Sequence, residues 1–298
     1  MRYGLLTRVA IFLFVGTTGE GNSFRVASYN VQNYLIQNRL VEEIYRQDYP
    51  KPEIEKASVR KTILKASPDI LGLQEIGDER FLSELQNDLE EEGLTYPFRY
   101  WMEADDRLRH LAVLSKIEAK EVIEHRELHF DYFGKRVPVK RGVLELVFQG
   151  ENEVRVHLFI LHLKSRFTDL AEDPRSALRR VGEATVIRDL IRDRMDTYPE
   201  RGMLVLGDFN DSINSRPLAR FLEVGGERLL GLVEMSDSRG EVWTHFYRAE
   251  ETYSRVDFVL VNESLKKRIA GMDRMIEDIV RPHGSDHRLI WLDIPMGE

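Results

Sequence analysis

Short apolar runs recur along the chain and predict β-strands. Their length and their content of β-branched residues favour strands over helices. The predicted strands cover residues 24–28, 70–73, 154–163, 203–206, 256–261 and 289–294.

Between these runs, apolar residues recur every three or four positions, which is typical of amphipathic helices. This pattern predicts helices over residues 54–66, 81–89 and 174–195. The first helix ends at Ser67-Pro68, because proline cannot continue a helix. Strands and helices alternate, while the runs 136–147 and 153–163 resemble a hairpin. The sequence therefore predicts a mixed α/β fold whose sheets are covered by helices.

The amino terminus has the pattern of a secretory signal peptide. Arg2 and Arg8 precede or flank an apolar run, residues 9–15, and small residues follow as far as Gly19. The run is too short to span a bilayer, which takes about 20 residues. The alternative is a first strand or a buried helix of the fold. We expect residues 1–19 to be a signal peptide and the protein to be exported, to the periplasm or the medium.

Composition narrows the chemistry of the remaining domain, which we expect to run from residue 24 to 295 because no repeat or long linker interrupts it. The chain has 43 Lys plus Arg against 51 Asp plus Glu, a formal net charge of −8. This balance argues against binding nucleic acid through bulk positive charge, whereas it suits carboxylates gathered around a divalent cation. The absence of cysteine excludes disulfides, thiolate metal sites and cysteine nucleophiles.

Polar side chains border nearly every predicted strand. Alone, each has an ordinary explanation as a turn residue, as the start of a surface loop or, for His162, as a core histidine. Asp257 differs, because an acid that enters an apolar strand is costly to bury without a partner. Strand ends meet at the rim of a sheet, so we expect these residues to converge on one cleft. They are Asn30, Glu75, His162, Asp208, Asn210, Asp257, Asp286 and His287.

This set suits the hydrolysis of a phosphate ester. Asn30, Glu75 and Asp286 supply oxygen donors of the kind that Mg²⁺ or Mn²⁺ prefers. His162 and His287 suit general acid–base catalysis and charge stabilisation. Phosphate ester hydrolysis needs a hard cation, an activated water and stabilised phosphate oxygens. A serine hydrolase is a poor fit, because the chain lacks a Gly-x-Ser-x-Gly motif.

The same residues lie in motifs that resemble the endonuclease/exonuclease/phosphatase superfamily, which includes DNase I-like nucleases, bacterial sphingomyelinases and inositol polyphosphate 5-phosphatases. The motifs occur in family order and cover almost the whole predicted domain. They are SYNVQNY (28–34), PDILGLQEI (68–76), HLAVLSK (110–116), LHLKS (161–165), LGDFND (206–211), SRVDFVLV (254–261) and GSDHRLI (284–290). The resemblance implies a four-layer α/β/β/α sandwich, in which two mostly antiparallel sheets pack face to face with helices outside.

The resemblance also implies roles for the polar residues at the strand ends. Asn30 and Glu75 match metal-site residues, with Asp286 as a further ligand, direct or through water. Asp208 and Asn210 match the pair that positions the attacking water and holds the scissile phosphate. His162 and His287 match the histidines that bracket the phosphate, and Asp257 matches the acid that orients the second of them. The expected reaction is in-line attack of water on phosphorus, with no covalent intermediate.

Other residues are candidates for substrate binding. Arg109 and Lys164 lie next to motif residues, where they either reach phosphate or form solvated surface. Thr244 lies in the aromatic segment WTHFY (243–247), which is similar to a segment of secreted bacterial relatives of extracellular nucleases. Its aromatic residues either stack on bases or belong to the core. His110 stands where many members of the family carry glycine, and both a ligand-facing and a packing role are open.

The predicted function is a Mg²⁺- or Mn²⁺-dependent phosphodiester hydrolase acting on nucleic acid, as an endonuclease or exonuclease. The first alternative is a phosphatase or sphingomyelinase-like enzyme for a small or lipid phosphoester, because one fold serves many substrates. The second is a catalytically silent binding module, against which the complete set of polar residues argues. We further expect a monomer without a stable membrane span, whose partner is the phosphoester substrate.

Overall fold

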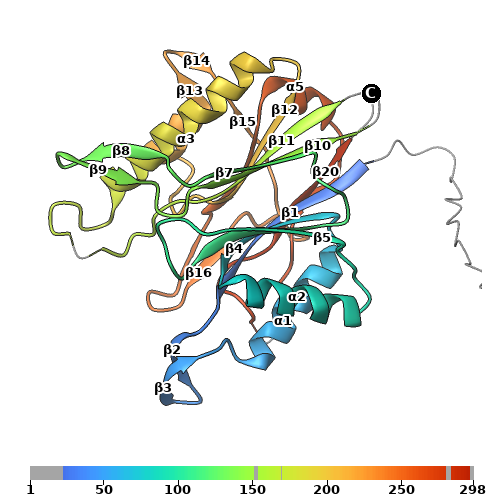
Figure 1. The fold of residues 1–298 in the computed structure, drawn as a ribbon, viewed down its shortest axis with the longest axis vertical. Helices are drawn as coiled ribbons and strands as arrows, with labels where there is room; N and C mark the ends of the chain where they lie inside the picture. Colours follow the sequence, from blue (N-terminus) through green and yellow to red (C-terminus); the bar gives the residue numbers. More distant parts are fainter. Residues whose placement is uncertain (1–22, 151–153, 169, 280–282, 296–298) are drawn as a thin grey trace, which may run out of the picture.

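Two six-stranded β-sheets pack face to face in a computed structural model of the chain, with helices on their outer faces (Figure 1). The structure describes residues 23–150, 154–168, 170–279 and 283–295. This is the α/β/β/α arrangement that the motifs implied. The predicted signal peptide, residues 1–19, lies outside the described residues.

The first sheet has the strand order β19-β20-β1-β4-β6-β5. Only β1 and β4 run parallel in it, and the other neighbours are antiparallel. Its strands are β1 (Ser23–Tyr34), β4 (Ile70–Ile76), β5 (Phe98–Met102), β6 (His110–Ser115), β19 (Arg274–Ile276) and β20 (Ile290–Pro295).

The second sheet has the order β15-β18-β12-β11-β10-β7 and is likewise mostly antiparallel, with β11 and β12 parallel. Its strands are β7 (Glu121–His125), β10 (Val143–Gln149), β11 (Arg155–His162), β12 (Gly202–Asp208), β15 (Gly231–Leu232) and β18 (Asp257–Val261). Short hairpins extend from the sheets: β2 (Gln37–Val41) with β3 (Ile44–Tyr49), β8 (His129–Tyr132) with β9 (Lys135–Pro138), β13 (Glu223–Val224) with β14 (Glu227–Arg228), and β16 (His245–Tyr247) with β17 (Thr252–Ser254).

Apolar side chains fill the spaces between these layers and drive their association. A central core lies between the sheets, and α1 (Glu53–Ala66) and α2 (Glu79–Glu91) enclose a second core against the first sheet. The helices α3 (Ala177–Thr197) and α4 (Arg216–Leu222) enclose a third core against the second sheet, whose β18 is followed by α5 (Glu263–Arg268). Figure 1 shows α1 and α2 on one side of the sandwich and α3 on the other.

Each predicted strand falls within or overlaps one of the central strands, and the predicted helices correspond to α1, α2 and α3. Two boundaries differ. The structure divides the predicted run 136–147 into β9 and β10, with Gly142 at a φ of +62° between them. The helix α3 begins at Ala177 rather than at residue 174, because residues 174–176 form a turn that Asp173 holds by accepting hydrogen bonds from the backbone of Leu178 and Arg179.

The parallel and antiparallel pairs bring several strand ends to the same rim. In the second sheet, His162 at the end of β11 is in register with Asp208 at the end of β12, and Asp208 is in register with Asp257 at the start of β18. In the first sheet, the register of β1 shifts after Asn30 and the register of β4 shifts around Glu75. Such irregularities re-aim side chains at a sheet edge.

No helix in the described part of the chain is long and apolar enough to cross a membrane.

Candidate functional site

Neighbouring strands of the second sheet place three polar residues side by side. His162, Asp208 and Asp257 are nearly inaccessible to solvent, and they follow one another across β11, β12 and β18. Gly207 precedes Asp208 with a φ of +143°, and a Cβ atom at this position would lie 2.0 Å from the carbonyl oxygen of Leu161. Only glycine permits this close approach of β12 to β11, which sets the direction of Asp208.

A hydrogen bond between the two sheets joins Asp208 to the first sheet. The side-chain amide of Asn30 donates to Oδ2 of Asp208 at 3.1 Å. Glu75 has a positive φ of 63°, and its Oε2 accepts a hydrogen bond of 2.9 Å from the backbone of Asn33. The other oxygen of Glu75 lies 3.9 Å from Nε2 of His162. Residues from both sheets therefore meet in one place, as the sequence predicted.

The segment before β20 delivers Asp286 and His287 to this place. Gly284 packs on α1 so closely that a Cβ atom would lie 2.6 Å from the backbone of Glu55 and Val59. The hydroxyl of Ser285 donates to the carbonyl of Asn30 at 2.7 Å and accepts from the backbone of His287 at 3.0 Å. The segment is thus fixed against both α1 and β1.

His287 and Asp257 form the closest charged pair of the site. Nδ1 of His287 donates to Oδ2 of Asp257 at 2.9 Å, and Nε2 lies 3.7 Å from Oδ2 of Asp208. Behind this pair, the hydroxyl of Thr244 accepts hydrogen bonds of 3.1 Å from the backbones of Val256 and Asp257. Thr244 is fully buried. The structure thus places this predicted substrate-binding residue where it positions Asp257.

Asn210 braces Asp208 from the turn that follows β12. It has a left-handed φ of 52°, and its backbone donates to Oδ1 of Asp208 at 2.8 Å. Its side-chain amide donates to Oδ2 of Asp208 at 3.1 Å and to the carbonyl of Leu163 at 3.0 Å. Both oxygens of Asp208 are therefore held in fixed directions.

The two histidines have opposite electrostatic environments. Burial alone would lower the pKa of His287, but the negative charges of Asp257 and Asp208 outweigh it and raise that pKa well above its ordinary value. Burial and the nearby positive charge of Arg141 hold the pKa of His162 well below its ordinary value. Burial also raises the pKa of Asp208. At neutral pH, His287 is the cationic histidine of the site and His162 the neutral one.

Carboxylates of the site can hold a divalent cation. Two groups of side chains place potential ligand atoms within 4.8 Å of one another: Asp208, Asp257 and His287, and His245, Asp286 and His287. Asp286 is partly exposed, and its ion-pair partners in the described residues are histidines at 3.7 Å and 4.0 Å. Carboxylate oxygens without a lysine or arginine partner fit a hard cation. Glu75 belongs to neither group, but its Oε1 faces Nε2 of His162 at 3.9 Å, and the same nitrogen lies 3.4 Å from Oδ2 of Asp208.

The predicted basic residues lie at the edge of the site. Nε of Arg109 is 3.9 Å from Oε2 of Glu75, and its side chain is partly exposed. Lys164 follows β11, and Nζ donates to the carbonyl and the hydroxyl of Ser165 at 3.2 Å each. Burial and the nearby Arg141 lower the pKa of Lys164 to about 8. His110 instead is buried and packs edge-on against Trp101, with the two ring centroids 4.8 Å apart. This arrangement favours a packing role for His110 over a ligand-facing one.

His245 is a site residue that the sequence did not single out. Nε2 of His245 lies 3.7 Å from Oδ2 of Asp286, and the ring centroids of His245 and His287 are 4.6 Å apart. An isolated β-bridge between His245 and His287 holds them together. The sequence signal is a histidine within the aromatic segment 243–247, where Thr244 and the aromatic residues are the candidates that the sequence offers for substrate contact.

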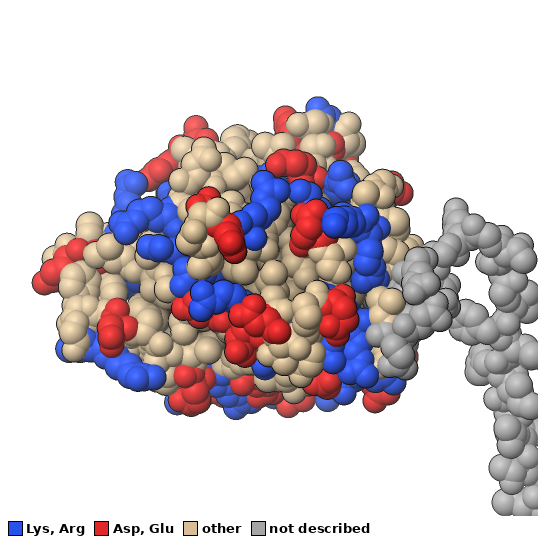
Figure 2. Space-filling model, turned by 90° about the horizontal axis from the view of Figure 1, so that it is seen from above, with Lys and Arg blue, Asp and Glu red and all other residues tan. Residues whose placement is uncertain are grey.

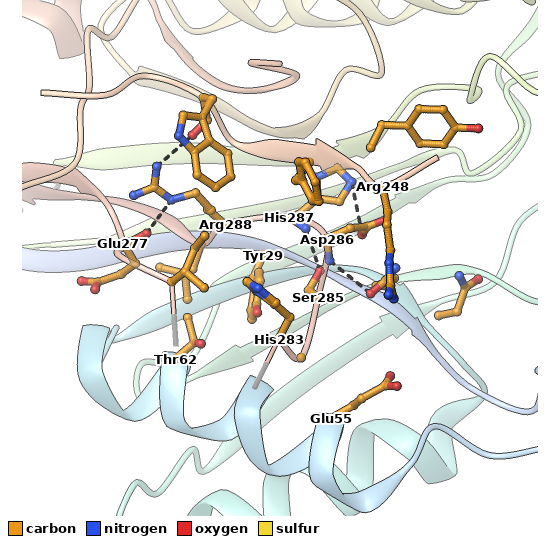
Figure 3. Close-up of a pocket in the computed structure, with 18 of the residues that line it drawn as sticks. Tyr29, Glu55, Thr62, Arg248, Glu277, His283, Ser285, Asp286, His287 and Arg288 are labelled. Atoms are coloured by element: carbon orange, nitrogen blue, oxygen red, sulfur yellow. Dashed lines mark hydrogen bonds and ion pairs between the residues drawn. The ribbon is translucent and has the colours of Figure 1, made fainter. Parts of the chain in front are cut away.

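A pocket of about 830 Å³ opens beside Asp286 and His287. Figure 3 shows it between α1, which contributes Glu55 and Thr62, and the segment that carries His283 to Arg288. Arg248, from the turn between β16 and β17, enters the pocket from the side opposite α1 (Figure 3). The site therefore adjoins a cavity on the side of Asp286 and His287.

Comparison with known proteins gives a family and a fold. Residues 27–287 match the profile of the Endonuclease/Exonuclease/phosphatase family. The structure is similar to the human Nocturnin catalytic domain with bound sulfate anion (17% identity, TM-score 0.62, covering 91% of this chain and 93% of that chain). It is also similar to truncated Caenorhabditis elegans TDP2 (17%, 0.62, 91% and 97%) and to sphingomyelinase C from Streptomyces griseocarneus (16%, 0.62, 92% and 99%). A comparison with curated protein sequences gives no match.

Proposed function

The chain belongs to the Endonuclease/Exonuclease/phosphatase family, and from this premise we propose that it is a divalent-metal-dependent phosphodiester hydrolase acting on nucleic acid. The observation that carries the proposal is the arrangement around Asp208. Asn30 and Asn210 hold its carboxylate, while the cationic His287, paired with Asp257 at 2.9 Å, faces it at 3.7 Å.

In this mechanism Asp208 positions the attacking water and accepts its proton. A carboxylate whose pKa is raised by burial is a better proton acceptor near neutral pH than an ordinary aspartate. Water attacks phosphorus in line, so that one P–O bond forms and the bond to the leaving group breaks. Asn210 acts through Asp208, because its side-chain amide donates to Oδ2 of Asp208 and to the carbonyl of Leu163 and so fixes the carboxylate that faces the phosphate.

The histidines act on the phosphate from two sides. His287 remains protonated because Asp257 and Asp208 stabilise its charge, and it stabilises the negative charge that develops on the phosphate oxygens. His162 is neutral and donates a hydrogen bond without adding charge. Because the two rings come from β11 and from the segment before β20, the phosphate lies between the sheets' rims.

The donor set of the site fits a divalent cation, because Asp286 has only histidines as ion-pair partners in the described residues and Oε1 of Glu75 has only His162, at 3.9 Å. In this proposal Asn30, Glu75 and Asp286 would hold Mg²⁺ or Mn²⁺, with His245 next to Asp286. When bound, the cation supplies Lewis-acid stabilisation of a phosphate oxygen. Removing a proton from water and orienting the phosphate remain the tasks of the protein side chains.

Nucleic acid as the substrate is supported by local charge rather than by net charge. Arg109 and Lys164 border the site, and Tyr247 presents an exposed ring beside it. On the face that Figure 2 shows, basic and acidic residues are interspersed without a large patch of one sign. Binding would therefore depend on contacts at the site, and its affinity should depend only moderately on salt.

A lipid phosphoester is the second candidate substrate. The hairpin of β2 and β3 exposes Leu40, Ile44 and Tyr45, which are 72%, 56% and 62% accessible. An exposed apolar cluster is typical of a contact with a lipid surface or a protein. One similar structure is that of a sphingomyelinase C.

The proposal includes the processing of the protein as well. We propose that residues 1–19 are removed during export and that the remaining chain acts as a monomer. Amino-terminal sequencing of the protein from the culture medium or the periplasm tests the first point. Light scattering of the purified protein tests the second, and a mass of two chains would contradict it.

The deciding experiment compares substrates under one set of conditions. The purified protein, with Mg²⁺ or Mn²⁺, is incubated with plasmid DNA, RNA, sphingomyelin, inositol phosphates and bis-p-nitrophenyl phosphate. We expect cleavage of DNA or RNA, and a loss of at least about 100-fold in His287→Ala. His129→Ala is the matched control, because His129 lies on the remote β8 hairpin.

Each outcome of this experiment decides one part of the proposal. Cleavage of sphingomyelin without cleavage of polynucleotides would show that the substrate is a lipid phosphoester, while phosphodiester hydrolysis would still be the reaction. If the wild-type protein hydrolyses none of these esters, the proposal that it is a phosphoester hydrolase would be refuted. Equal rates for His287→Ala and wild type would refute the mechanism.

A further inference from the structure

The mechanism above leaves the pocket beside Asp286 and His287 unused. Its volume of about 830 Å³ is in the range of small-molecule sites. Tyr29 of β1 and Thr62 of α1 line it, and Gln32 and Asn33 line it next to the metal-site residues. A substrate whose phosphate lies at His287 would therefore place its adjoining group in this pocket.

The charges that line the pocket leave one cation without a partner. Each of the pocket's acids faces a cationic or histidine side chain: Glu55 faces Lys51 at 3.1 Å, Glu277 faces Lys65 at 2.8 Å, Asp278 faces Arg288 at 3.7 Å and Asp286 faces His245 at 3.7 Å. Arg288 pairs with Asp237 at 2.9 Å, and both Arg39 and Arg288 donate to backbone carbonyls. Within the described residues, the side chain of Arg248 is exposed and makes no hydrogen bond or ion pair. Among the arginines that line the described pocket, Arg248 is therefore the one whose guanidinium is available to an anionic ligand.

The wall that carries Arg248 is aromatic and fixed to the site. Tyr247 is 48% accessible, and the neighbouring Phe246 donates a backbone hydrogen bond of 2.9 Å to the carbonyl of Asp286. The carboxamides of Gln32, Asn33 and Gln37 line the pocket as well. An exposed ring, amide groups and an unpaired guanidinium are the groups that contact a base, its edge and a phosphate.

We propose that this pocket binds one nucleotide unit next to the scissile phosphate, with Tyr247 against its base and Arg248 on a second phosphate group. This inference rests on the proposed function and names the part of the substrate that the site recognises. Tyr29 of β1 and Thr62 of α1 line the end of the pocket that would take this unit. Two phosphates are needed to occupy both His287 and Arg248, so a nucleoside with one phosphate fills only half of the site.

Calorimetry with product-like ligands tests the second phosphate directly. Wild-type protein in magnesium buffer is titrated with adenosine 3′,5′-bisphosphate and with adenosine 5′-monophosphate, neither of which contains a phosphodiester bond. We expect the bisphosphate to bind at least about tenfold more tightly, since arginine–phosphate hydrogen bonds are charge-assisted. Equal affinities for the two ligands, or tighter binding of phosphocholine than of either, would overturn the proposal.

Substitutions of Arg248 and Tyr247 test whether these two side chains bind the second phosphate and the base. Arg248→Ala should remove the tenfold preference, and Arg248→Lys should restore part of it because the charge is kept. Arg228→Ala, an exposed arginine on β14, is the control and should bind like wild type. Tyr247→Ala should weaken both ligands about tenfold, whereas Tyr247→Phe should not, because stacking needs the ring alone. A preference that survives in Arg248→Ala would refute the assignment.

Kinetics separates this pocket from the catalytic groups. Bis-p-nitrophenyl phosphate has a single phosphate, so Arg248→Ala should keep kcat/KM for it within about twofold while KM for an oligonucleotide rises about tenfold. An equal loss on both substrates would show a catalytic or structural role and overturn the proposal. If wild type prefers the bisphosphate but cleaves no polynucleotide, the proposed function is wrong, whereas the proposed nucleotide binding in the pocket is supported. If it cleaves polynucleotide without that preference, the proposed nucleotide binding in the pocket is wrong, whereas the proposed function is supported.

Discussion

Replacing the buried Glu145 with glutamine tests whether a charge network stabilises the second sheet. The carboxylate of Glu145 on β10 accepts hydrogen bonds of 2.6 Å from His125 and from His157, and one of 3.1 Å from Arg194 on α3. Burial alone would raise the pKa of Glu145, but these hydrogen bonds and the charge of Arg194 outweigh it and lower the pKa from 4.5 to about 2.

The size of this effect follows from the change in pKa. Because the folded pKa lies below the unfolded value, the ionised carboxylate stabilises the fold above pH 4.5, and this contribution is lost as the pH falls toward 2. The difference between the two values corresponds to about 3 kcal/mol, of which about 2 kcal/mol is lost by pH 3. The free energy of unfolding of Glu145→Gln should therefore be about 3 kcal/mol below wild type at pH 7 and about 1 kcal/mol below it at pH 3.

Urea denaturation followed by circular dichroism at pH 7, 5, 4 and 3 measures this gap. Glu90→Gln, an exposed position on α2, is the control and should follow wild type at every pH. A gap for Glu145→Gln that stays constant from pH 7 to pH 3 would refute the reasoning, because it would show that ionisation of this carboxylate does not stabilise the fold.

Further predictions concern the site itself. Asp257→Asn removes the charge that raises the pKa of His287, so kcat should fall about 100-fold and the alkaline limb of the pH–rate profile should move to lower pH. Thr244→Val leaves two buried backbone N–H groups without an acceptor and should lower the free energy of unfolding by about 1–3 kcal/mol, measured in urea. EDTA should abolish hydrolysis and Mg²⁺ restore it, and Glu75→Gln should need at least about tenfold more Mg²⁺ for half-maximal rate. An unchanged pH profile, stability or Mg²⁺ requirement, respectively, would contradict each prediction.

The sequence predicted the central strands because they are buried on both faces and therefore read as uninterrupted apolar runs. Their polar ends could be predicted as well. His162, Asp208 and Asp257 each stand at the border of such a run, and adjacent strands that end at one rim bring such residues together. The short hairpins carry no comparable pattern. No residue of β2 or β3 is fully buried, and apolar residues such as Leu40 and Ile44 are among the exposed ones, so hydrophobicity does not follow burial in this hairpin.

Contacts between distant segments account for what the sequence did not predict. His245 reaches the site through a bridge to His287, a pairing that no local period encodes. Thr244 is a predicted substrate-binding residue, and its hydroxyl accepts hydrogen bonds from the backbones of Val256 and Asp257 at the start of β18, a contact that no local period encodes. The metal-site candidates Glu75 and Asp286 depend on backbone irregularities after Asn30, with Gln32 and Asn33 at φ values of 46° and 52°. Such turns were not predictable from propensity.

Net charge is a poor guide to the ligand of this protein, since most of its charges are neutralised locally. The formal charge of −8 counts acids such as Glu55 and Glu277, which pair with Lys51 and Lys65 at 3.1 Å and 2.8 Å. What a ligand meets at the site is the protonated His287 and the guanidinium of Arg248, which has no partner among the residues that the structure describes, together with any cation held by the remaining carboxylates. An anionic substrate is therefore compatible with an acidic protein, because interactions between exposed charges are largely screened beyond about 8–10 Å at physiological salt.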